Sequence, residues 1–139
     1  MSIEIERVSD FTDELGKFID QQFCAYAEKH GITVNYQEFC FLAKDGDKIV
    51  GVITGHSYYR DVHIGDLIVM EECRGQDVGT RLVRRVEEEF AGKGYENINL
   101  TTYAFQAPEF YKKLGYEVEY VRKSADEKLT KYFLIKKLT

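Results

Sequence analysis

The spacing of apolar residues divides the chain into helical and extended segments. Apolar residues recurring every third or fourth position predict a long amphipathic helix from Phe11 to Ala27, with Asp10 as its N-cap and Gly31 as its stop. The same spacing predicts a second helix from Val78 to Phe90. Short alternating or continuous apolar runs predict strands at residues 2–8, 39–43, 49–53, 64–70, 97–102, 116–121 and 132–135.

The order of these elements predicts the fold class. Pro108, the only proline, stands where the first turn of a short helix ending near Leu114 begins. A strand and a helix come first, then three antiparallel strands, then helix, strand, helix and two strands. This order predicts an α/β protein of the α+β kind, with a mixed, mostly antiparallel sheet of about six to seven strands and helices on both faces. A length of 139 residues predicts one domain that spans residues 1–139.

Composition narrows the class of protein. Hydrophobic residues make up 44% of the chain, enough for a core, and the net charge of −5 argues against a nucleic-acid partner. No apolar run is long enough to span a membrane, and the acidic N-terminus does not resemble a signal peptide, so we expect a cytoplasmic protein without a membrane partner. Three widely spaced cysteines with no C-x-x-C pair indicate neither disulfides nor a metal site.

The charge is unevenly divided along the chain. Residues 1–70 carry 12 acidic and 6 basic side chains, whereas residues 71–139 carry 12 acidic and 13 basic ones. The first half therefore suits a cationic partner and the second half tolerates an anion, although two solvated surfaces would give the same counts.

The segment from Leu67 to Phe90 is the most informative part of the sequence. A strand that ends in a glycine-containing turn before a helix presents unpaired backbone N–H groups and the positive end of the helix dipole, which together favour an anion such as phosphate. The sequence contains neither G-K-[ST] nor G-x-G-x-x-G, so it is typical of neither a Walker loop nor a Rossmann site.

Two motifs in this order resemble those of the GNAT superfamily of N-acetyltransferases. The run Arg74-Gly75-Gln76-Asp77-Val78-Gly79 resembles the signature [RQ]-x-x-G-x-[GA], and Ala107-Pro108-Glu109-Phe110-Tyr111-Lys112-Lys113-Leu114-Gly115-Tyr116 resembles A-x-x-F-Y-x-K-x-G-[FY]. The separation of the motifs and the preceding antiparallel strands also match. The resemblance implies a GNAT-like fold and acetyl-CoA as the acyl donor, with no metal.

The resemblance also implies roles for individual residues. The loop from Gly75 to Thr80 would hold the pyrophosphate of acetyl-CoA, and Leu67, Ile68 and Val69 would line the pantetheine arm. Tyr111 would protonate the departing thiolate. The complete set of implied cofactor contacts is Leu67, Ile68, Val69, Arg74, Gly75, Gln76, Asp77, Val78, Gly79, Thr80, Ala104 and Phe110.

Two positions depart from the family pattern. Asp77 stands where a glycine is expected, and Ala104 stands where an asparagine is usual. A carboxylate beside a phosphate site repels it unless the side chain turns to solvent. Tyr103 and Gln106 are candidates to replace the missing amide.

The acceptor side is less specific in the sequence. An amine must lose a proton before it attacks, and Asp66 is our candidate for the catalytic base, with His63 as a further candidate. A backbone N–H of Ile68 or Val69 would stabilise the oxyanion. We expect the acceptor site to be walled by the first helix, the loop from Gly31 to Tyr36 and the aromatic pair Tyr58 and Tyr59.

Three functions remain open at this stage. The first is an acetyl-CoA-dependent N-acetyltransferase that acts by direct attack in a ternary complex on the amine of a small molecule or peptide, with a cationic acceptor favoured by the charge and a homodimer left open. The second is a non-catalytic CoA-binding, sensing or interaction domain with the same fold. The third is a structural module whose glycine loop binds another phosphate.

Overall fold

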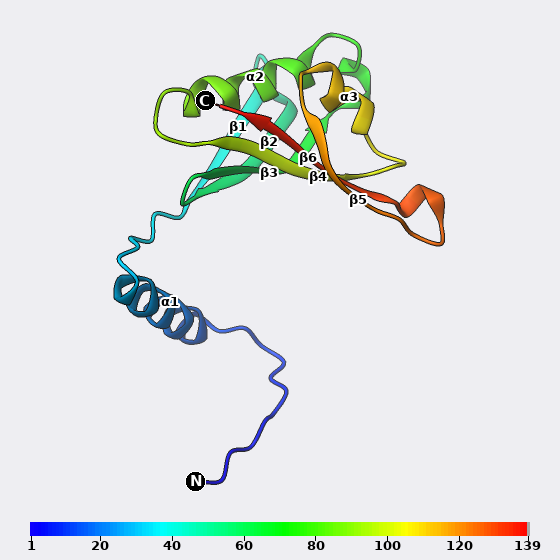
Figure 1. Ribbon diagram of the computed structural model, residues 1–139. Helices are drawn as coiled ribbons and strands as arrows, with labels where there is room; N and C mark the ends of the chain where they lie inside the picture. The colour runs from blue at the N-terminus through cyan, green and yellow to red at the C-terminus, as the bar shows by residue number, and fades with distance from the viewer. Residues whose placement is uncertain (139) are drawn as a thin grey trace. The chain divides into compact units, whose positions relative to one another are not determined.

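The computed structural model describes residues 1–138 (Figure 1). The chain divides into two compact units, Met1–Val34 and Asn35–Thr139. The prediction of one acyltransferase domain over residues 1–139 stays a prediction.

The first unit contains one helix, α1 (Asp13–Lys29). Its N-cap is Thr12, whose hydroxyl oxygen accepts a hydrogen bond from the Leu15 N–H at 3.2 Å, so the expected cap at Asp10 is wrong by two residues. Gly31 follows the helix at φ +72° and ends it as predicted. The strand expected at residues 2–8 is wrong, because a strand exists only through pairing and none of the described strands pairs with this segment.

The second unit is built on a six-stranded sheet with the order β1-β2-β3-β4-β6-β5. Its strands are β1 (Gln37–Asp45), β2 (Lys48–Tyr58), β3 (Asp61–Val69), β4 (Asn97–Tyr103), β5 (Glu117–Arg122) and β6 (Lys131–Lys137). Strands β1, β2 and β3 form the predicted antiparallel meander, and among the described strands only β3 and β4 pair in parallel. The mixed α/β fold with a sheet of six strands is confirmed, whereas helices on both faces of the sheet stay a prediction.

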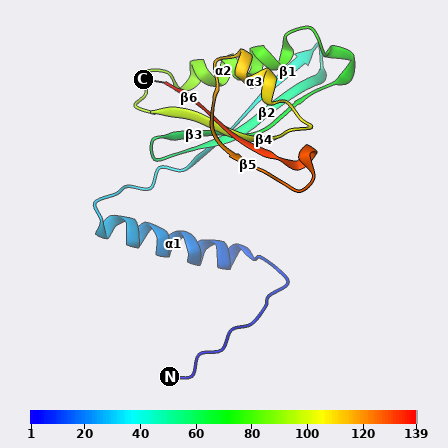
Figure 2. The ribbon, with the colours of Figure 1, turned by 45° about the vertical axis from the view of Figure 1, so that its right-hand side comes forward.

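The helices α2 (Val78–Phe90) and α3 (Pro108–Lys113) of this unit lie on one face of the sheet, which we call the helix face (Figures 1 and 2). Short 3-10 turns occur at Glu71–Cys73 and Glu127–Leu129. Helix α2 buries Leu82, Val83, Val86 and Phe90, four of its five predicted apolar positions, and Val78 packs partly against them. These side chains meet the alternate residues of β2, β3 and β4 that point to the helix face, including Ile53, Val62, Ile64, Ile98 and Leu100.

Candidate functional site: a cleft between two diverging strands

Strands β3 and β4 separate soon after they begin to pair. Their parallel register runs from Asp61 opposite Asn97 to His63 opposite Asn99 and ends there. The remainder of β3 pairs only with β2, and the remainder of β4 only with β6. The edge of β3 that faces β4 is therefore left unpaired, among the described residues, from Ile64 onward.

A β-bulge marks the point where the two strands diverge. Between Ile64 and Leu67, β3 carries one more residue than the opposing segment of β2. A bulge changes which face the following side chains occupy. Beyond it, Leu67 packs against the core, and Val69 lies against Gly79 of α2.

The register fixes which backbone groups point into the opening. The Met70 N–H donates to the Val50 carbonyl of β2 at 2.8 Å, and the Ile68 carbonyl also lies on the β2 side, near Gly51. Because strand residues alternate in direction, the N–H and C=O groups of Leu67 and Val69 point toward β4. Of the two residues expected to supply an oxyanion donor, Val69 is oriented for it, whereas Ile68 is committed to β2.

A pocket of about 570 Å³ occupies this opening and continues to the start of α2. Ten of the twelve cofactor-contact residues that the sequence predicts line it; Gln76 and Ala104 do not. Its lining is Leu67, Ile68, Val69, Cys73, Arg74, Gly75, Asp77, Val78, Gly79, Thr80, Ala107 and Phe110. We refer to this pocket as the cofactor cleft.

The loop at one end of the cleft suits an anion. The first-turn N–H groups of α2 have no acceptor inside the helix, and Asp77, which occupies the N-cap position, makes no side-chain cap. Arg74 adds a cation to the lining. The negative carboxylate of Asp77 in the same lining repels an anion. The backbone of Asp77 has φ +61°, a left-handed conformation in which glycine has no steric penalty.

The two departures from the family pattern have different surroundings. Ala104 lies outside the cleft, where its N–H donates to the Thr130 carbonyl at 2.9 Å. The side-chain oxygen of Gln106 accepts from the Tyr103 N–H at 3.0 Å, so this amide oxygen closes the turn before α3. Only Asp77 therefore departs from the pattern inside the cleft.

Tyr111 and Asp66, the two predicted catalytic residues, both lie outside the cleft lining. Tyr111 is buried in the core beside Tyr116, and its neighbour Phe110 lines the cleft, because consecutive helical residues point in different directions. Burial raises the pKa of Tyr111 to about 12. Asp66 is exposed on the bulge, where its N–H donates to the Thr54 hydroxyl oxygen at 3.2 Å and its carboxylate accepts from that hydroxyl at 3.4 Å.

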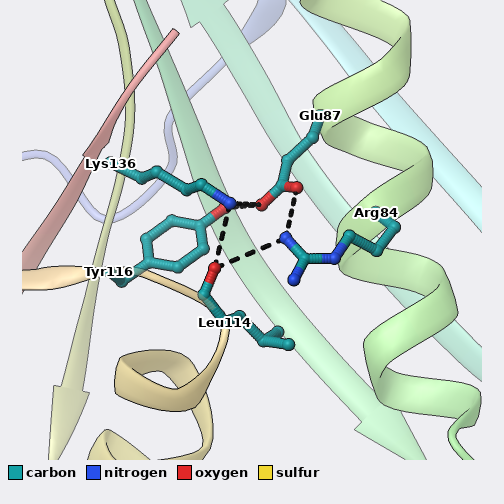
Figure 3. Close-up of polar contacts among 5 residues, drawn as sticks. All are labelled: Arg84, Glu87, Leu114, Tyr116 and Lys136. Carbon is teal, nitrogen blue, oxygen red and sulfur yellow. Dashed lines mark hydrogen bonds and ion pairs between the residues drawn. The ribbon is translucent and has the colours of Figure 1, made fainter.

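A polar cluster lies just after the C-terminal end of α3, around the Leu114 carbonyl (Figure 3). The carboxylate of Glu87, whose side chain is 14% exposed, accepts from Arg84 at 2.7 Å, from the Tyr116 hydroxyl at 2.9 Å and from Lys136 at 3.2 Å. Lys136 and Arg84 also donate to the Leu114 carbonyl just after α3, at 2.9 and 3.4 Å. Burial, together with the neighbouring Glu87, raises the pKa of Tyr116.

Sequence reasoning missed two residues of the lining. Ala107 opens the second motif, and its place in that motif could have identified it. Cys73 lies just before the first motif, on the 3-10 turn, and no sequence signal pointed to it.

The unpaired edge, the anion-suited loop and the cleft that joins them define a site for an extended, amide-bearing ligand with an anionic end. The proteins that this chain resembles are acetyltransferases, which agrees with a site for such a ligand. The model of the Acetyltransferase (GNAT) family matches residues 5–116. The blasticidin-S acetyltransferase of Streptomyces morookaense is 32% identical over 95 residues, which cover 66% of this chain and 68% of that protein.

Solved structures show the same architecture. An acetyltransferase from Bacillus cereus superposes with a TM-score of 0.76 at 29% identity, covering 96% of this chain and 98% of that one. An aminoglycoside 6'-N-acetyltransferase complexed with coenzyme A has a TM-score of 0.66 at 21% identity, covering 93% and 82%, which is a likeness of fold alone.

The chain belongs to the Acetyltransferase (GNAT) family. It is an enzyme of the acetyl-CoA-dependent N-acetyltransferase class. Among the described residues, no helix is both long and apolar enough to cross a membrane.

Proposed function

We propose that this enzyme transfers the acetyl group of acetyl-CoA to the primary amine of a small molecule or peptide by direct attack in a ternary complex. The observation that carries the proposal is the unpaired edge at Leu67 and Val69, which leads directly into the loop at the start of α2. An extended chain of amides can pair with that edge as an added strand would. The relatives named above are acetyltransferases, which supports the same reaction.

The cofactor contacts follow from the lining of the cleft. Gly75 to Thr80 would hold the pyrophosphate through backbone N–H groups and the helix dipole, with Arg74 as a cation beside them. Leu67 and Val69 would pair with the pantetheine arm, and Phe110 would close the opposite wall. Acetyl-CoA supplies the acetyl group as a thioester when it is bound there.

Acetyl transfer requires the protein to stabilise the developing oxyanion and to protonate the departing thiolate. An N–H of Leu67 or Val69 would stabilise the negative charge that develops on the carbonyl oxygen as the nitrogen–carbon bond forms. Tyr111 would donate a proton to sulfur as the carbon–sulfur bond breaks, a role that requires its hydroxyl to reach the cleft from its place in the core beside Phe110. With a pKa of about 12 the phenol stays protonated throughout the neutral range, as an acid must, although it is a weaker acid than an exposed tyrosine.

Turnover of acetyl-CoA, followed as free thiol across a panel of amines, tests this function. Tyr111→Phe is expected to lower turnover by about ten- to a thousandfold and to leave the CoA dissociation constant unchanged, because only a proton donor is lost. Tyr120→Phe is the matched control, since Tyr120 is exposed on β5. If the chemical step limits the rate and Tyr111→Phe turns over as fast as Tyr120→Phe, then Tyr111 is not the proton donor and serves only in packing.

The order of substrate addition tests direct attack. Cys73 lines the cleft, so an acetylated cysteine is the competing route. We expect Cys73→Ala to keep its activity and initial-rate plots to intersect, as a ternary complex requires. Parallel plots, or an inactive but folded Cys73→Ala variant, would refute direct attack.

A non-catalytic CoA-binding domain is the alternative from the sequence, and Asp77 bears on the affinity for CoA, not on the choice between binding and turnover. Its carboxylate lies in the cleft where a phosphate must approach. CoA binding without turnover of any amine in the panel would support that alternative over the enzyme.

The cytoplasmic location stays a prediction.

A further inference from the structure

Four polar residues stand opposite one another across β1, β2, β3 and β4. Glu38 pairs with His56, His56 with His63, and His63 with Asn99 in the strand registers. The rings of His56 and His63 lie 5.2 Å apart. Val62 and Ile64, on either side of His63, point to the helix face, so this histidine row lies on the other face of the sheet.

A chain of side-chain hydrogen bonds fixes the far end of the row. Asn97 donates to Asp61 at 2.7 Å, and Asn99 donates to Asn97 at 2.8 Å. Because the amide nitrogen of Asn99 is used in this way, its oxygen accepts from Nδ1 of His63 at 2.7 Å. The His63 ring is therefore held with its proton on Nδ1 and with Nε2 free of this chain.

A second pocket, of about 420 Å³, lies against the other end of the row. The Tyr36 ring packs 5.2 Å from that of His56 and 5.4 Å from that of Tyr58. Glu38 is an exposed carboxylate on β1 beside them. The full lining is Tyr36, Glu38, Phe39, Cys40, Thr54, Gly55, His56 and Gly65, which includes no lysine or arginine.

The second pocket and the cofactor cleft meet the same short stretch of β3. Gly65 lines the second pocket, and Leu67, two residues further on, lines the cofactor cleft. Asp66 lies between them and bonds to Thr54, which also lines the second pocket. His63 is the last β3 residue paired with β4, so the row ends where the opening between these strands begins.

The groups that face His56 favour its neutral form. Burial lowers the pKa of His56, and the neighbouring His63 lowers it further, whereas Glu38 raises it. Tyr36 faces the same ring from the segment before β1, and Tyr58 lies against Tyr36. A neutral imidazole can accept a proton, and Glu38 with Tyr36 offers a carboxylate and an aromatic face, the two groups that attract an alkylammonium ion.

We propose that the second pocket is the acceptor subsite for a cationic primary amine, which Glu38 and Tyr36 hold while His56 takes its proton. This proposal rests on the proposed function. It adds the residues that would bind the cationic amine, and it assigns the role of base to His56, whereas the candidates from the sequence are Asp66 and His63.

The proton balance of the reaction closes on these groups. The ammonium ion gives one proton to His56, and the imidazolium formed passes it to solvent. The neutral nitrogen then bonds to the carbonyl carbon, the carbon–sulfur bond breaks, and the thiolate takes one proton from Tyr111, which regains a proton from solvent. The nitrogen loses its second proton to solvent as the amide forms, so one proton is released overall for each acetyl group transferred.

Binding of n-pentylamine tests the subsite without requiring turnover. The imidazole proton resonances of His56 are expected to shift and saturate with n-pentylamine but not with n-pentanol, the uncharged analogue. Glu38→Gln should weaken this binding about two- to fivefold, as the loss of one exposed ion pair does. Glu117→Gln, on the edge strand β5, is the matched control and should bind as the wild type does. Equal binding by the two variants, or no saturable shift of His56, would overturn the proposal.

Kinetics with n-pentylamine test the base. His56→Ala should lower kcat about a hundredfold, remove the acid limb of the wild-type kcat profile, which lies below the range of an ordinary imidazole because burial lowers the pKa of His56, and regain activity with added imidazole. An unchanged kcat and acid limb, or saturable binding of n-pentylamine without acetylation by the wild type, would overturn the role of His56. CoA affinity, measured in every variant, should not change; a wild type that binds no CoA would instead refute the proposed function.

Discussion

Replacing Asp77 with glycine or asparagine should tighten CoA binding, and the two variants separate charge from backbone effects. Asp77 lines the cofactor cleft, is exposed and makes no helix cap. Both variants remove its charge. Asparagine tolerates the left-handed backbone about as well as aspartate, whereas glycine also removes the steric penalty of φ +61°.

The magnitude follows from Coulomb's law. Two unit charges about 6 Å apart repel by roughly 3 kcal/mol at an effective dielectric constant near 20, and by roughly 0.7 kcal/mol in bulk water. Because Asp77 is exposed, we expect the lower value, which tightens CoA binding about threefold. For stability, the gain from relieving the left-handed residue, roughly 1 kcal/mol, is offset by the greater freedom of glycine in the unfolded chain. The urea midpoint of Asp77→Gly should therefore stay close to that of the wild type.

Calorimetric titration with CoA at low and high salt measures this effect. Asp77→Asn and Asp77→Gly should tighten binding equally at low salt, and the gain should vanish near 1 M salt, where the Debye length is about 3 Å. Glu119→Gln is the control for a change in net charge remote from the cleft. Weaker CoA binding in Asp77→Asn would refute the repulsion argument and show that the carboxylate is favourable where it stands.

Three other substitutions test the packing around the site. Gly79→Val should weaken CoA binding, measured by calorimetry, without unfolding the protein, because a Cβ there would lie 3.3 Å from the Phe110 ring that lines the cleft. Gly55→Ala should lower the free energy of unfolding by about 3 kcal/mol in urea titration, because a Cβ would collide with the carbonyl oxygen of His63. Glu87→Ala should cost about 2 kcal/mol in the same titration, since it removes the shared acceptor of three donors and leaves the buried Tyr116 hydroxyl without its partner.

Each of these substitutions has its own control. Gly79→Ala should weaken CoA binding less than Gly79→Val, and the reverse order would exclude a steric cause. Gly65→Ala meets the Thr54 hydroxyl at an ordinary 3.4 Å and should cost far less stability than Gly55→Ala. Tyr116→Phe removes one hydrogen bond of the cluster and should cost about 1 kcal/mol. A larger loss in Tyr116→Phe than in Glu87→Ala would contradict the central place of the carboxylate.

The sequence predicted the parts of the fold that depend on local pattern. The spacing of Leu82, Val83, Val86 and Phe90 identified the buried side of α2, because helical periodicity is a property of neighbouring residues. The strand expected at residues 2–8 failed for the complementary reason. Alternation shows that a segment could lie on a sheet but does not supply its partner, and none of the described strands pairs there.

The residues of the candidate site that belong to sequence motifs could be predicted from the sequence. Those that come together only through strand pairing could not. The glycine loop and Phe110 were found by resemblance, and the structure brings both into one cleft. Glu38 and His56 belong to no motif, since they meet only through the pairing of β1 with β2. The orientation of the Leu67 and Val69 amides likewise depends on how β3 pairs with β2, which one sequence does not specify.

The most direct test of the account is amide hydrogen exchange of β3, measured residue by residue with and without CoA. The N–H groups of Leu67 and Val69 face the unpaired edge, whereas Ile68 is already committed to β2. We predict that CoA slows exchange at Leu67 and Val69 and leaves Ile68 nearly unchanged. Equal protection of all three amides, or protection of Ile68 alone, would contradict the claim that the cleft between β3 and β4 binds the cofactor along this edge.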